Sequence, residues 1–318
     1  MKRLPLKKYT DTLKYYKTNT SAGEGVYPFY SSFKITKKCG MRCPFCNVWK
    51  EKTPDLETKD ILRIMDNLAE SSTFVLCYEG GEPFMRKDIE EIMKHGHSMP
   101  YYTSVVTNGL LVDDGIMDKC YKYLDFLHMS IDEGHDNMYL YDRLHEFKKR
   151  WDIIFVVQVV VPQEHLPALE EKVRRIYEAK AKVCIMPACH LDNTDDMYPD
   201  PQAFKDEVIR LRKKYPRTII TASYFLYSIN RPHSCTTASI IIDPDGTVYY
   251  PCRTLGEKEV SLLETPLRDY LVSDDAKKRR QMMKGCNRDC GWYQYFAVSF
   301  SSWRTLGMEV RDISRRLI

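Results

Sequence analysis

Long hydrophobic runs are missing from this sequence of 318 residues. The longest apolar stretch, Ile153 to Val161, is far shorter than the roughly 20 residues that a membrane-spanning helix needs, and Gln158 interrupts it. The N-terminal residues carry the positive charge of a signal peptide but lack its apolar segment and small-residue cleavage site. We therefore expect a cytoplasmic protein in which the apolar stretch is a buried strand.

Glycine and proline are scarce as well, with 14 and 16 copies, and low-complexity segments are lacking. This composition excludes fibrous and disordered classes of protein.

The 48 basic residues nearly balance the 44 acidic ones, so the net charge is only +4. The basic character is concentrated in residues 1–17, which we interpret as a solvated arm. Such an arm can also attract nucleic acid or anionic lipid head groups, although nucleic acid is the less favoured partner.

Cysteine, by contrast, is plentiful, with 11 copies. In a cytoplasmic chain this favours metal ligation or redox chemistry over disulfides. Cys39, Cys43 and Cys46 have the spacing C-x3-C-x2-C, and three thiolates on one loop suit an iron-sulfur cluster whose fourth iron is left open. The alternative is structural zinc, which normally needs a fourth ligand, and no histidine precedes His95.

Apolar runs alternate with helix-like segments over about the first 190 residues. The strand candidates are Phe29 to Thr36, Phe74 to Tyr78, Tyr102 to Val106, Phe126 to Ile131, Ile153 to Val161 and Val183 to Pro187. Helical spacing occurs between them, as in Ile61, Leu62, Met65 and Leu68, or in Leu169, Val173, Ile176 and Tyr177. This alternation predicts an α/β fold, a partial (β/α)6 barrel similar to a TIM barrel, with its chemistry on the loops that follow the strands.

Two motifs fall on the first two of these loops. Cys39-Gly-Met-Arg-Cys43-Pro-Phe45-Cys46 follows the first strand, and Gly80-Gly81-Glu82-Pro83 follows the second. Together they closely resemble the radical SAM superfamily over residues 25–190. The resemblance implies that the three cysteines hold a four-iron, four-sulfur (4Fe-4S) cluster. In this family, the cluster binds and reductively cleaves S-adenosylmethionine (SAM) to a 5′-deoxyadenosyl radical.

The same resemblance implies a set of SAM-binding residues. Phe45 would lie against the adenine, and Gly80, Gly81, Glu82 and Pro83 would receive the methionine amino group. Further candidates for contact with SAM are Thr107, Asn108, Ser130, Asp132, Arg143 and Gln158. For Arg143, a solvent-exposed helix arginine is the alternative, and Gln158 could be an ordinary strand residue.

A second group of cysteines occupies the last third of the chain: Cys235, Cys252, Cys286 and Cys290. Pro-Asp-Gly at 244–246 predicts a β-hairpin of residues 239–243 and 247–250, flanked by the first two of these thiols. The arrangement resembles the SPASM extension of radical SAM enzymes in its shorter Twitch form, which implies one auxiliary 4Fe-4S cluster. The final C-x3-C spacing departs from the commoner C-x2-C, and a zinc site of four cysteines is the alternative.

The remaining cysteines lack the spacing of ligands, and we expect Cys77, Cys120, Cys184 and Cys189 to be core residues, with Cys189 the least certain of them.

We divide the chain into a basic arm (1–27), the barrel (28–195), a connection (196–234) that includes a helix from Gln202 to Tyr215, a SPASM/Twitch-like α+β domain (235–291) and an amphipathic helix (292–318). The helix follows from a continuous stripe of Trp292, Phe296, Phe300, Trp303, Leu306, Val310, Ile313 and Leu317. It would dock on the barrel or lie on a membrane surface.

These observations predict a radical SAM enzyme that abstracts hydrogen from an unactivated carbon of a peptide or small molecule, giving oxidation or bond formation. A ferredoxin or flavodoxin would supply the electrons. One alternative is radical modification of a membrane lipid or isoprenoid, because of the C-terminal helix and the basic arm. An alternative of another class is a zinc or iron-sulfur protein that binds nucleic acid without catalysis.

Overall fold

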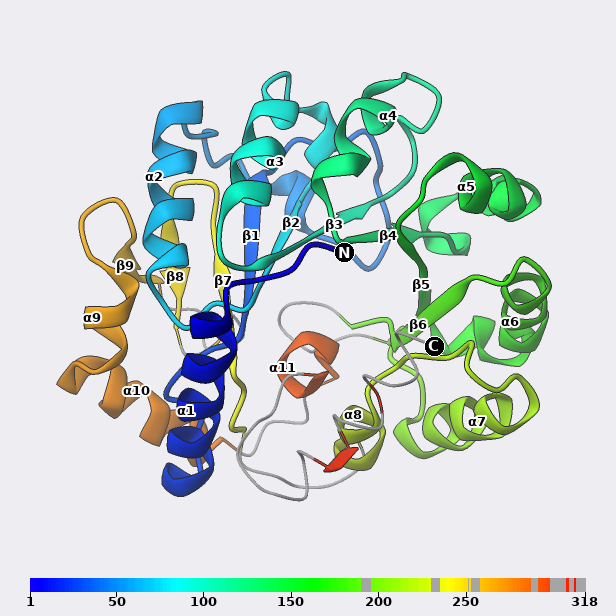
Figure 1. Ribbon diagram of the computed structural model, residues 1–318. Helices are drawn as coiled ribbons and strands as arrows, with labels where there is room; N and C mark the ends of the chain where they lie inside the picture. The colour runs from blue at the N-terminus through cyan, green and yellow to red at the C-terminus, as the bar shows by residue number, and fades with distance from the viewer. Residues whose placement is uncertain are drawn as a thin grey trace.

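A computed structural model describes residues 1–189, 196–229, 235–250, 252, 258–286, 291–297, 307–308 and 312. One nine-stranded sheet runs through this part of the chain in the order β6-β5-β4-β3-β2-β1-β7-β8-β9 (Figure 1). The strands are β1 (Tyr30–Thr36), β2 (Val75–Gly80), β3 (Tyr102–Thr107), β4 (Phe126–Ser130), β5 (Ile154–Val161), β6 (Lys182–Pro187), β7 (Ser239–Ile242), β8 (Thr247–Tyr249) and β9 (Lys258–Ser261).

Strands β1 to β6 pair in parallel and in sequence order, which confirms the predicted open (β/α)6 barrel. The outer helices are α2 (Thr58–Ala69), α3 (Ile89–Ser98), α4 (Ile116–Cys120), α5 (Leu144–Arg150), α6 (Leu169–Glu178) and α7 (Pro201–Lys214). Figure 1 shows them as an arc around the convex side of the sheet. Right-handed crossovers place them there, since each strand must return to the same edge.

Each layer follows from the spacing of its apolar residues. In α2, Ile61, Ile64 and Leu68 recur at helical spacing and are at most 1% exposed. In β1, Phe33 and Ile35 alternate with polar residues and are fully buried against those helices. Burial of such side chains contributes about 1.5–3 kcal/mol each, and this interface of sheet and helices is the main core.

The N-terminal segment is a docked helix rather than a free arm, although Arg3, Lys7, Lys14 and Lys17 are exposed as expected. It forms α1 (Leu6–Ala22), and Lys8 is only 8% exposed, with its ammonium 3.1 Å from the Ser71 carbonyl oxygen. The Lys2 ammonium donates to the carbonyls of Gly96, His97 and Met99, at the end of α3. A cation is favoured there by the unpaired carbonyls and the negative end of the helix dipole. The number of basic residues in this segment does not reveal that the segment packs against the barrel.

The C-terminal strands extend the sheet beyond β1. Strand β7 pairs in parallel with β1, and β8 and β9 follow antiparallel. The predicted hairpin of β7 and β8 is confirmed, with Gly246 at a φ of +80° in its turn. Strand β9 was not predicted. Three helices, α8 (Ser223–Ser228), α9 (Leu267–Leu271) and α10 (Asp274–Lys284), complete this part of the chain.

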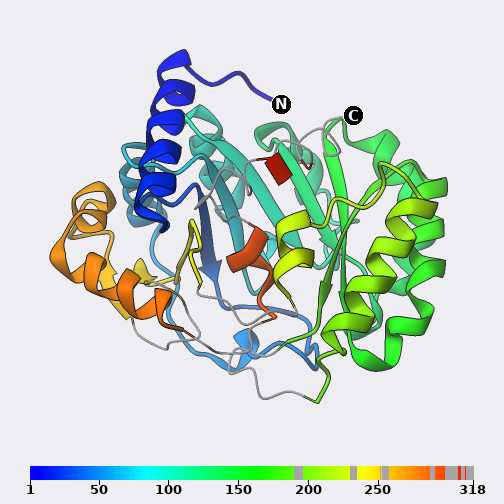
Figure 2. The same ribbon diagram turned by 90° about the horizontal axis from the view of Figure 1, so that it is seen from below.

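Of the predicted C-terminal helix, the structure describes α11 (Tyr293–Ala297), and most of the remaining stripe lies outside the described residues. This short helix lies on the concave side of the sheet (Figure 2). Its Tyr293 packs edge-on against Phe225 of α8. Within the described residues, no helix has the length and apolar character to cross a membrane.

Candidate active site

The first cysteine motif forms the loop at the carboxyl end of β1. Cys43 is 8% exposed, whereas Cys39 and Cys46 are half-buried. The loop is held by a 3.1 Å hydrogen bond from the Cys46 amide to the Cys43 carbonyl. Two donors approach the Cys39 sulfur: the Met41 amide at 3.4 Å and the Asn108 side-chain amide at 3.6 Å. Hydrogen bonds of this kind tune sulfur ligands of iron-sulfur clusters.

The three thiols are close enough to influence one another. Burial raises the pKa of Cys39, the Met41 amide partly offsets this, and the charges of Glu82, Cys43 and Cys46 raise it further. Across the described residues, no three His, Cys, Asp or Glu side chains converge tightly enough to ligate a single metal ion. A 4Fe-4S cluster takes one thiolate on each ligated iron, and three partly buried thiols on one loop suit such a cluster.

The glycines of Gly80-Gly81-Glu82-Pro83 allow a close approach, but to this chain's own backbone. A Cβ on Gly80, whose φ is +136°, would lie 2.1 Å from the Thr36 carbonyl oxygen, and one on Gly81 would lie 2.0 Å from that of Lys38. The Gly81 and Glu82 amides donate to these two carbonyls, both at 2.7 Å. The second loop is therefore fastened to the segment that leads into Cys39.

Glu82 joins this second loop to the third. Its carboxylate is fully buried and accepts hydrogen bonds from the Phe84 amide (3.1 Å), the Thr107 hydroxyl (2.9 Å) and the Asn108 amide (2.8 Å). Burial raises the pKa of Glu82 to about 7, although these donors lower it. Three of the expected SAM-binding residues thus form one network, and Asn108 extends it to the Cys39 sulfur.

Phe45 and Asp132 meet at the loop after β4. The Phe45 ring lies 5.4 Å from the His135 ring, and a Cβ on Gly134 would come within 2.0 Å of it. Asp132 is fully buried, 2.8 Å from His135 Nδ1, and accepts from the Val160 amide at 3.0 Å. The burial of His135 lowers its pKa, but Asp132 and Cys43 raise it to about 10. These contacts fix the loop beside the cysteine motif.

The other expected SAM contacts divide into two groups. Ser130 and Gln158 face the inside of the barrel, where the Ser130 hydroxyl lies 3.5 Å from the Gln158 side-chain oxygen. The guanidinium of Arg143, in contrast, binds Asp113 and Glu146 and is not among the groups that line the barrel cavity. The placement of Arg143 at the SAM carboxylate is therefore not supported, because its charge is already paired.

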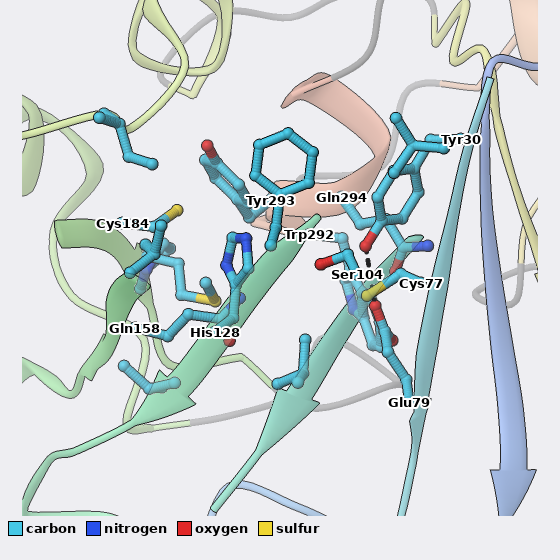
Figure 3. A pocket seen from close by; sticks show the side chains of 18 of the residues that line it. Tyr30, Cys77, Glu79, Ser104, His128, Gln158, Cys184, Trp292, Tyr293 and Gln294 are labelled. Atoms are coloured by element: carbon cyan, nitrogen blue, oxygen red, sulfur yellow. Dashed lines mark hydrogen bonds between the residues drawn. The ribbon is translucent and has the colours of Figure 1, made fainter. Parts of the chain in front are cut away.

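A cavity of about 390 Å³ lies inside the barrel beneath these loops. It is walled mainly by apolar side chains from β2 to β6 and is covered by residues 292–294 beside α11. Figure 3 shows its polar groups on two sides, with Tyr30, Cys77, Glu79 and Ser104 on one side and His128, Gln158 and Cys184 on the other.

Three of the remaining cysteines are buried, as expected: Cys77, Cys120 and Cys184 are at most 4% exposed. Cys184 packs in a small apolar cluster with Val156 and Ile220. Cys77 and Cys184 also line the cavity, together with the half-buried Cys189.

Glu79, Tyr30, Ser104 and His128 were missed by the sequence reasoning, although a signal for them exists. Polar residues occur at every second position of otherwise apolar strands, for instance at positions 30, 32 and 34 of β1 and at 77 and 79 of β2. Side chains at alternate positions share one face of a strand, so this pattern marks an inner polar face.

The second cysteine group is described in part. Cys252 is 6% exposed, just after β8, while Cys235 and Cys286 are half-buried. Cys286 follows the end of α10, and its amide donates to the Met283 carbonyl at 3.0 Å. Cys290 lies outside the described residues.

Comparison with known proteins places these features in a family. The family model "Radical SAM superfamily" matches residues 33–199. A PqqA peptide cyclase of Granulibacter bethesdensis is 32% identical over 104 residues, which cover 31% of this chain and 28% of that protein. One of Bradyrhizobium diazoefficiens is 31% identical over 88 residues, covering 27% and 23%. The chain thus matches only about a quarter of the length of these curated relatives.

Solved structures agree in fold over nearly the whole chain. SuiB of Streptococcus suis bound to SAM superposes with a TM-score of 0.68 at 14% identity, covering 92% of this chain and 81% of that chain. anSMEcpe with bound AdoMet superposes with a TM-score of 0.64 at 14% identity, covering 91% and 99%. Since the family model spans more than half of the chain, this protein belongs to the radical SAM superfamily.

Proposed function

We propose that this enzyme modifies a side chain of a peptide by abstracting a hydrogen atom from one of its carbons. The observation that carries the proposal is the cavity directly beneath the cysteine loop, mostly apolar and with a few polar groups on its walls. Peptides occur among the relatives, as in PqqA peptide cyclase and in SuiB bound to its precursor peptide SuiA. A cavity of about 390 Å³ suits one inserted side chain better than a folded domain.

Cys39, Cys43 and Cys46 would hold the 4Fe-4S cluster, which supplies the electron that cleaves SAM to the 5′-deoxyadenosyl radical. Phe45 would lie against the adenine, and the loop Gly80–Pro83 would receive the methionine amino group. Thr107, Asn108, Ser130, Asp132 and Gln158 would complete the SAM site from the loops and ends of β3, β4 and β5. Arg143 is left out of this set because its guanidinium is paired with Asp113 and Glu146.

The barrel walls would orient the substrate and exclude water. Phe126, Val156 and Met186 contribute apolar surface, and Trp292 covers the chamber from the concave side. Holding the target carbon in one orientation lowers the entropic cost of the transfer. Exclusion of water and oxygen prevents side reactions of the radical.

For the C-terminal part of the chain we propose a Twitch-like unit with one auxiliary 4Fe-4S cluster, bound by Cys235, Cys252, Cys286 and Cys290. This cluster would accept an electron from the substrate radical. Its support is the burial of Cys252 next to the hairpin and the position of Cys286 at the end of α10. We further propose that the enzyme works in the cytoplasm, with a ferredoxin or flavodoxin as electron donor.

Cysteine substitutions in the reconstituted enzyme test this division of roles. With iron, sulfide, SAM and dithionite, the wild type should bind about eight irons, four per cluster, and release 5′-deoxyadenosine. Cys39→Ala should lose half of the iron and all SAM cleavage, whereas Cys286→Ala should keep SAM cleavage but lose product. Tight zinc binding without SAM cleavage, or an equal and total loss in both variants, would refute the proposal.

A further inference from the structure

A carboxylate stands inside the apolar chamber. Glu79 is the last residue of β2 before the glycines, and among the described residues it is the only acidic one that lines the cavity. Its two oxygens accept hydrogen bonds from the Tyr30 hydroxyl at 3.0 Å and from the Ser32 hydroxyl at 2.7 Å. Figure 3 shows Tyr30 and Glu79 side by side on one wall.

The strand register places Glu79 at the end of the chamber wall that adjoins the loop Gly80–Pro83. On one side, Glu79 pairs with Lys34 of β1. On the other side, Tyr78 pairs with Val105 of β3, so Glu79 lies level with Val106. Val106 is in turn level with His128 of β4. This layer lies directly below the loop Gly80–Pro83, so a substrate group bound at Glu79 would lie next to the proposed SAM site.

Few charges within the described residues can compensate this carboxylate. The cavity is lined by neither lysine nor arginine in the part of the chain that the structure describes. Lys34 is buried next to it in register, but no ion pair joins the two side chains. Burial raises the pKa values of Tyr30 and Cys77 well above their ordinary range, so both stay protonated.

The groups around Glu79 favour a ligand with several donors. The Tyr30 hydroxyl gives its hydrogen to Glu79, and the Ser104 hydroxyl bonds the Cys77 thiol. Each hydroxyl oxygen therefore keeps lone pairs that can accept. Together with the carboxylate of Glu79 they offer three acceptor groups on one wall, which suits the three donors of an ammonium group. An apolar wall opposite them suits the methylene stem of such a side chain.

We propose that Glu79 is a specificity-determining residue that binds the terminal ammonium of a lysine side chain of the substrate, with its methylene carbons lying in the chamber. This inference rests on the proposed function, since it names the side chain that the radical attacks. An ammonium in an apolar cavity forms a strong hydrogen bond with a carboxylate. A substrate side chain with an uncharged or anionic end would leave Glu79 without a counter-charge, so the site should reject it.

Labelled amino acid derivatives provide the test. The N-acetyl, N-methylamide derivatives of lysine, norleucine and 2-aminoadipate have similar side-chain lengths and end in an ammonium, a methyl and a carboxylate. Each is deuterated along the side chain and incubated with reconstituted enzyme, SAM and dithionite, and deuterium in the released 5′-deoxyadenosine is measured. We expect the lysine derivative to transfer at least about tenfold more deuterium than either of the others.

The variant E79Q separates charge from shape, since glutamine has nearly the same size and the neighbouring hydroxyls can donate or accept. It should lower transfer from the lysine derivative to the norleucine level while SAM cleavage without substrate persists. The control E57Q removes a carboxylate whose side chain is 73% exposed and should retain the preference for lysine. Equal transfer from all three derivatives in the wild type, or no transfer from any while SAM is cleaved, would overturn the inference. Absence of SAM cleavage in the wild type would instead overturn the proposed function.

Discussion

At the scale of single residues, Glu82 illustrates why a carboxylate and not its amide is required. Its two oxygens receive three hydrogen bonds, two of them from backbone amides. A glutamine has only one acceptor oxygen, so its NH2 group would face either the Asn108 amide or the pair of Phe84 and Thr107. The consequence is a buried donor without an acceptor.

We therefore predict that Glu82→Gln lowers the free energy of unfolding by about 1–3 kcal/mol at pH 8, where Glu82 is ionised. Because burial raises the pKa of Glu82 from 4.5 to about 7, the folded wild type keeps this proton longer than the unfolded chain and loses stability as the pH rises between these values. The difference between wild type and variant should thus shrink from pH 5 to pH 8. Denaturant unfolding at both pH values measures it, with E57Q as control, and a gap independent of pH would contradict the prediction.

The sequence predicted residues in loops better than residues on strands. Cys39, Phe45 and Gly80 belong to short motifs whose order along the chain fixes their position at one edge of the sheet. Glu79 belongs to no motif that we recognised, and its role depends on an open chamber that only the curvature of the sheet creates. Arg143 was assigned from its position alone, and its partner Asp113, 30 residues away, could not be read from that position.

At the scale of elements, α1 is joined to the barrel by a buried lysine. Burial lowers the pKa of Lys8 from 10.5 to about 8, so the unfolded chain holds this proton more tightly and stability rises as the pH increases between these values. Lys8→Met keeps the apolar stem and removes the buried charge. We predict that it raises the free energy of unfolding by about 1 kcal/mol at pH 7 and that this gain fades toward pH 10.

Lys7→Met is the matched control for this prediction, since the neighbouring Lys7 side chain is 85% exposed. Its effect should stay within about 0.5 kcal/mol. A destabilised Lys8→Met variant at pH 7 would show that the hydrogen bond to the Ser71 carbonyl outweighs the cost of burying the charge.

A second element-scale contact ties the cysteine loop to the C-terminal hairpin. Lys37, two residues before Cys39, has its ammonium 3.0 Å from Asp243 at the end of β7 and 2.5 Å from Glu51. The side chains of Lys37 and Asp243 are 3% and 1% exposed. The Tyr249 hydroxyl of β8 also donates to Asp243 at 3.2 Å.

We predict that Asp243→Asn lowers the free energy of unfolding by about 2 kcal/mol or more, because it leaves a buried ammonium partly uncompensated. It should also lower the iron retained by the Cys39 loop, measured as iron per chain and as the electron paramagnetic resonance signal of the reduced cluster. Lys38→Met serves as control, since it lies equally near the loop but is 70% exposed. Unchanged iron and stability in Asp243→Asn would refute the coupling.

Elements themselves were largely predictable from their periodicity. Strands β1 to β6 and helices α2 and α6 occur where alternating or helical spacing of apolar residues placed them. Strand β9 was missed because its short segment, Lys258–Ser261, has no apolar alternation of its own and depends on pairing with β8. Helix α1 was missed because its buried residues include Lys8 and Asn19, which pattern reading counts as exposed.

At the scale of the whole molecule, the two halves of the chain share one sheet. Strand β7 pairs with β1 over four residue pairs, from Tyr30 with Ser239 to Phe33 with Ile242. A buried ion pair joins Glu24, before β1, to Arg280 of α10 at 3.1 Å. The boundaries at residues 195 and 235 remain predictions, but these contacts show that the halves are interdependent.

We accordingly predict that a chain ending at residue 235 does not fold as a soluble monomer. Its loss of β7 would leave β1 as an unprotected edge strand, a template for association between chains. Size-exclusion chromatography and circular dichroism of the truncated and full chains measure this. A monomeric truncated chain with cooperative unfolding would show that the barrel is independent of β7 to β9.

The position of β1 between β2 and β7 also determines where this architecture can vary. The segment between β6 and β7 bridges elements that do not pair with each other, and of its described residues 218–220 bond to β6 through the backbone. Its length can therefore change outside these residues without moving the strand register. An insertion in β1 or β7 would shift Glu79's neighbours and the cysteine loop together. Diversification of substrate among proteins built this way should therefore concentrate in the connection from β6 to β7, while the strand that leads to the cluster keeps its length.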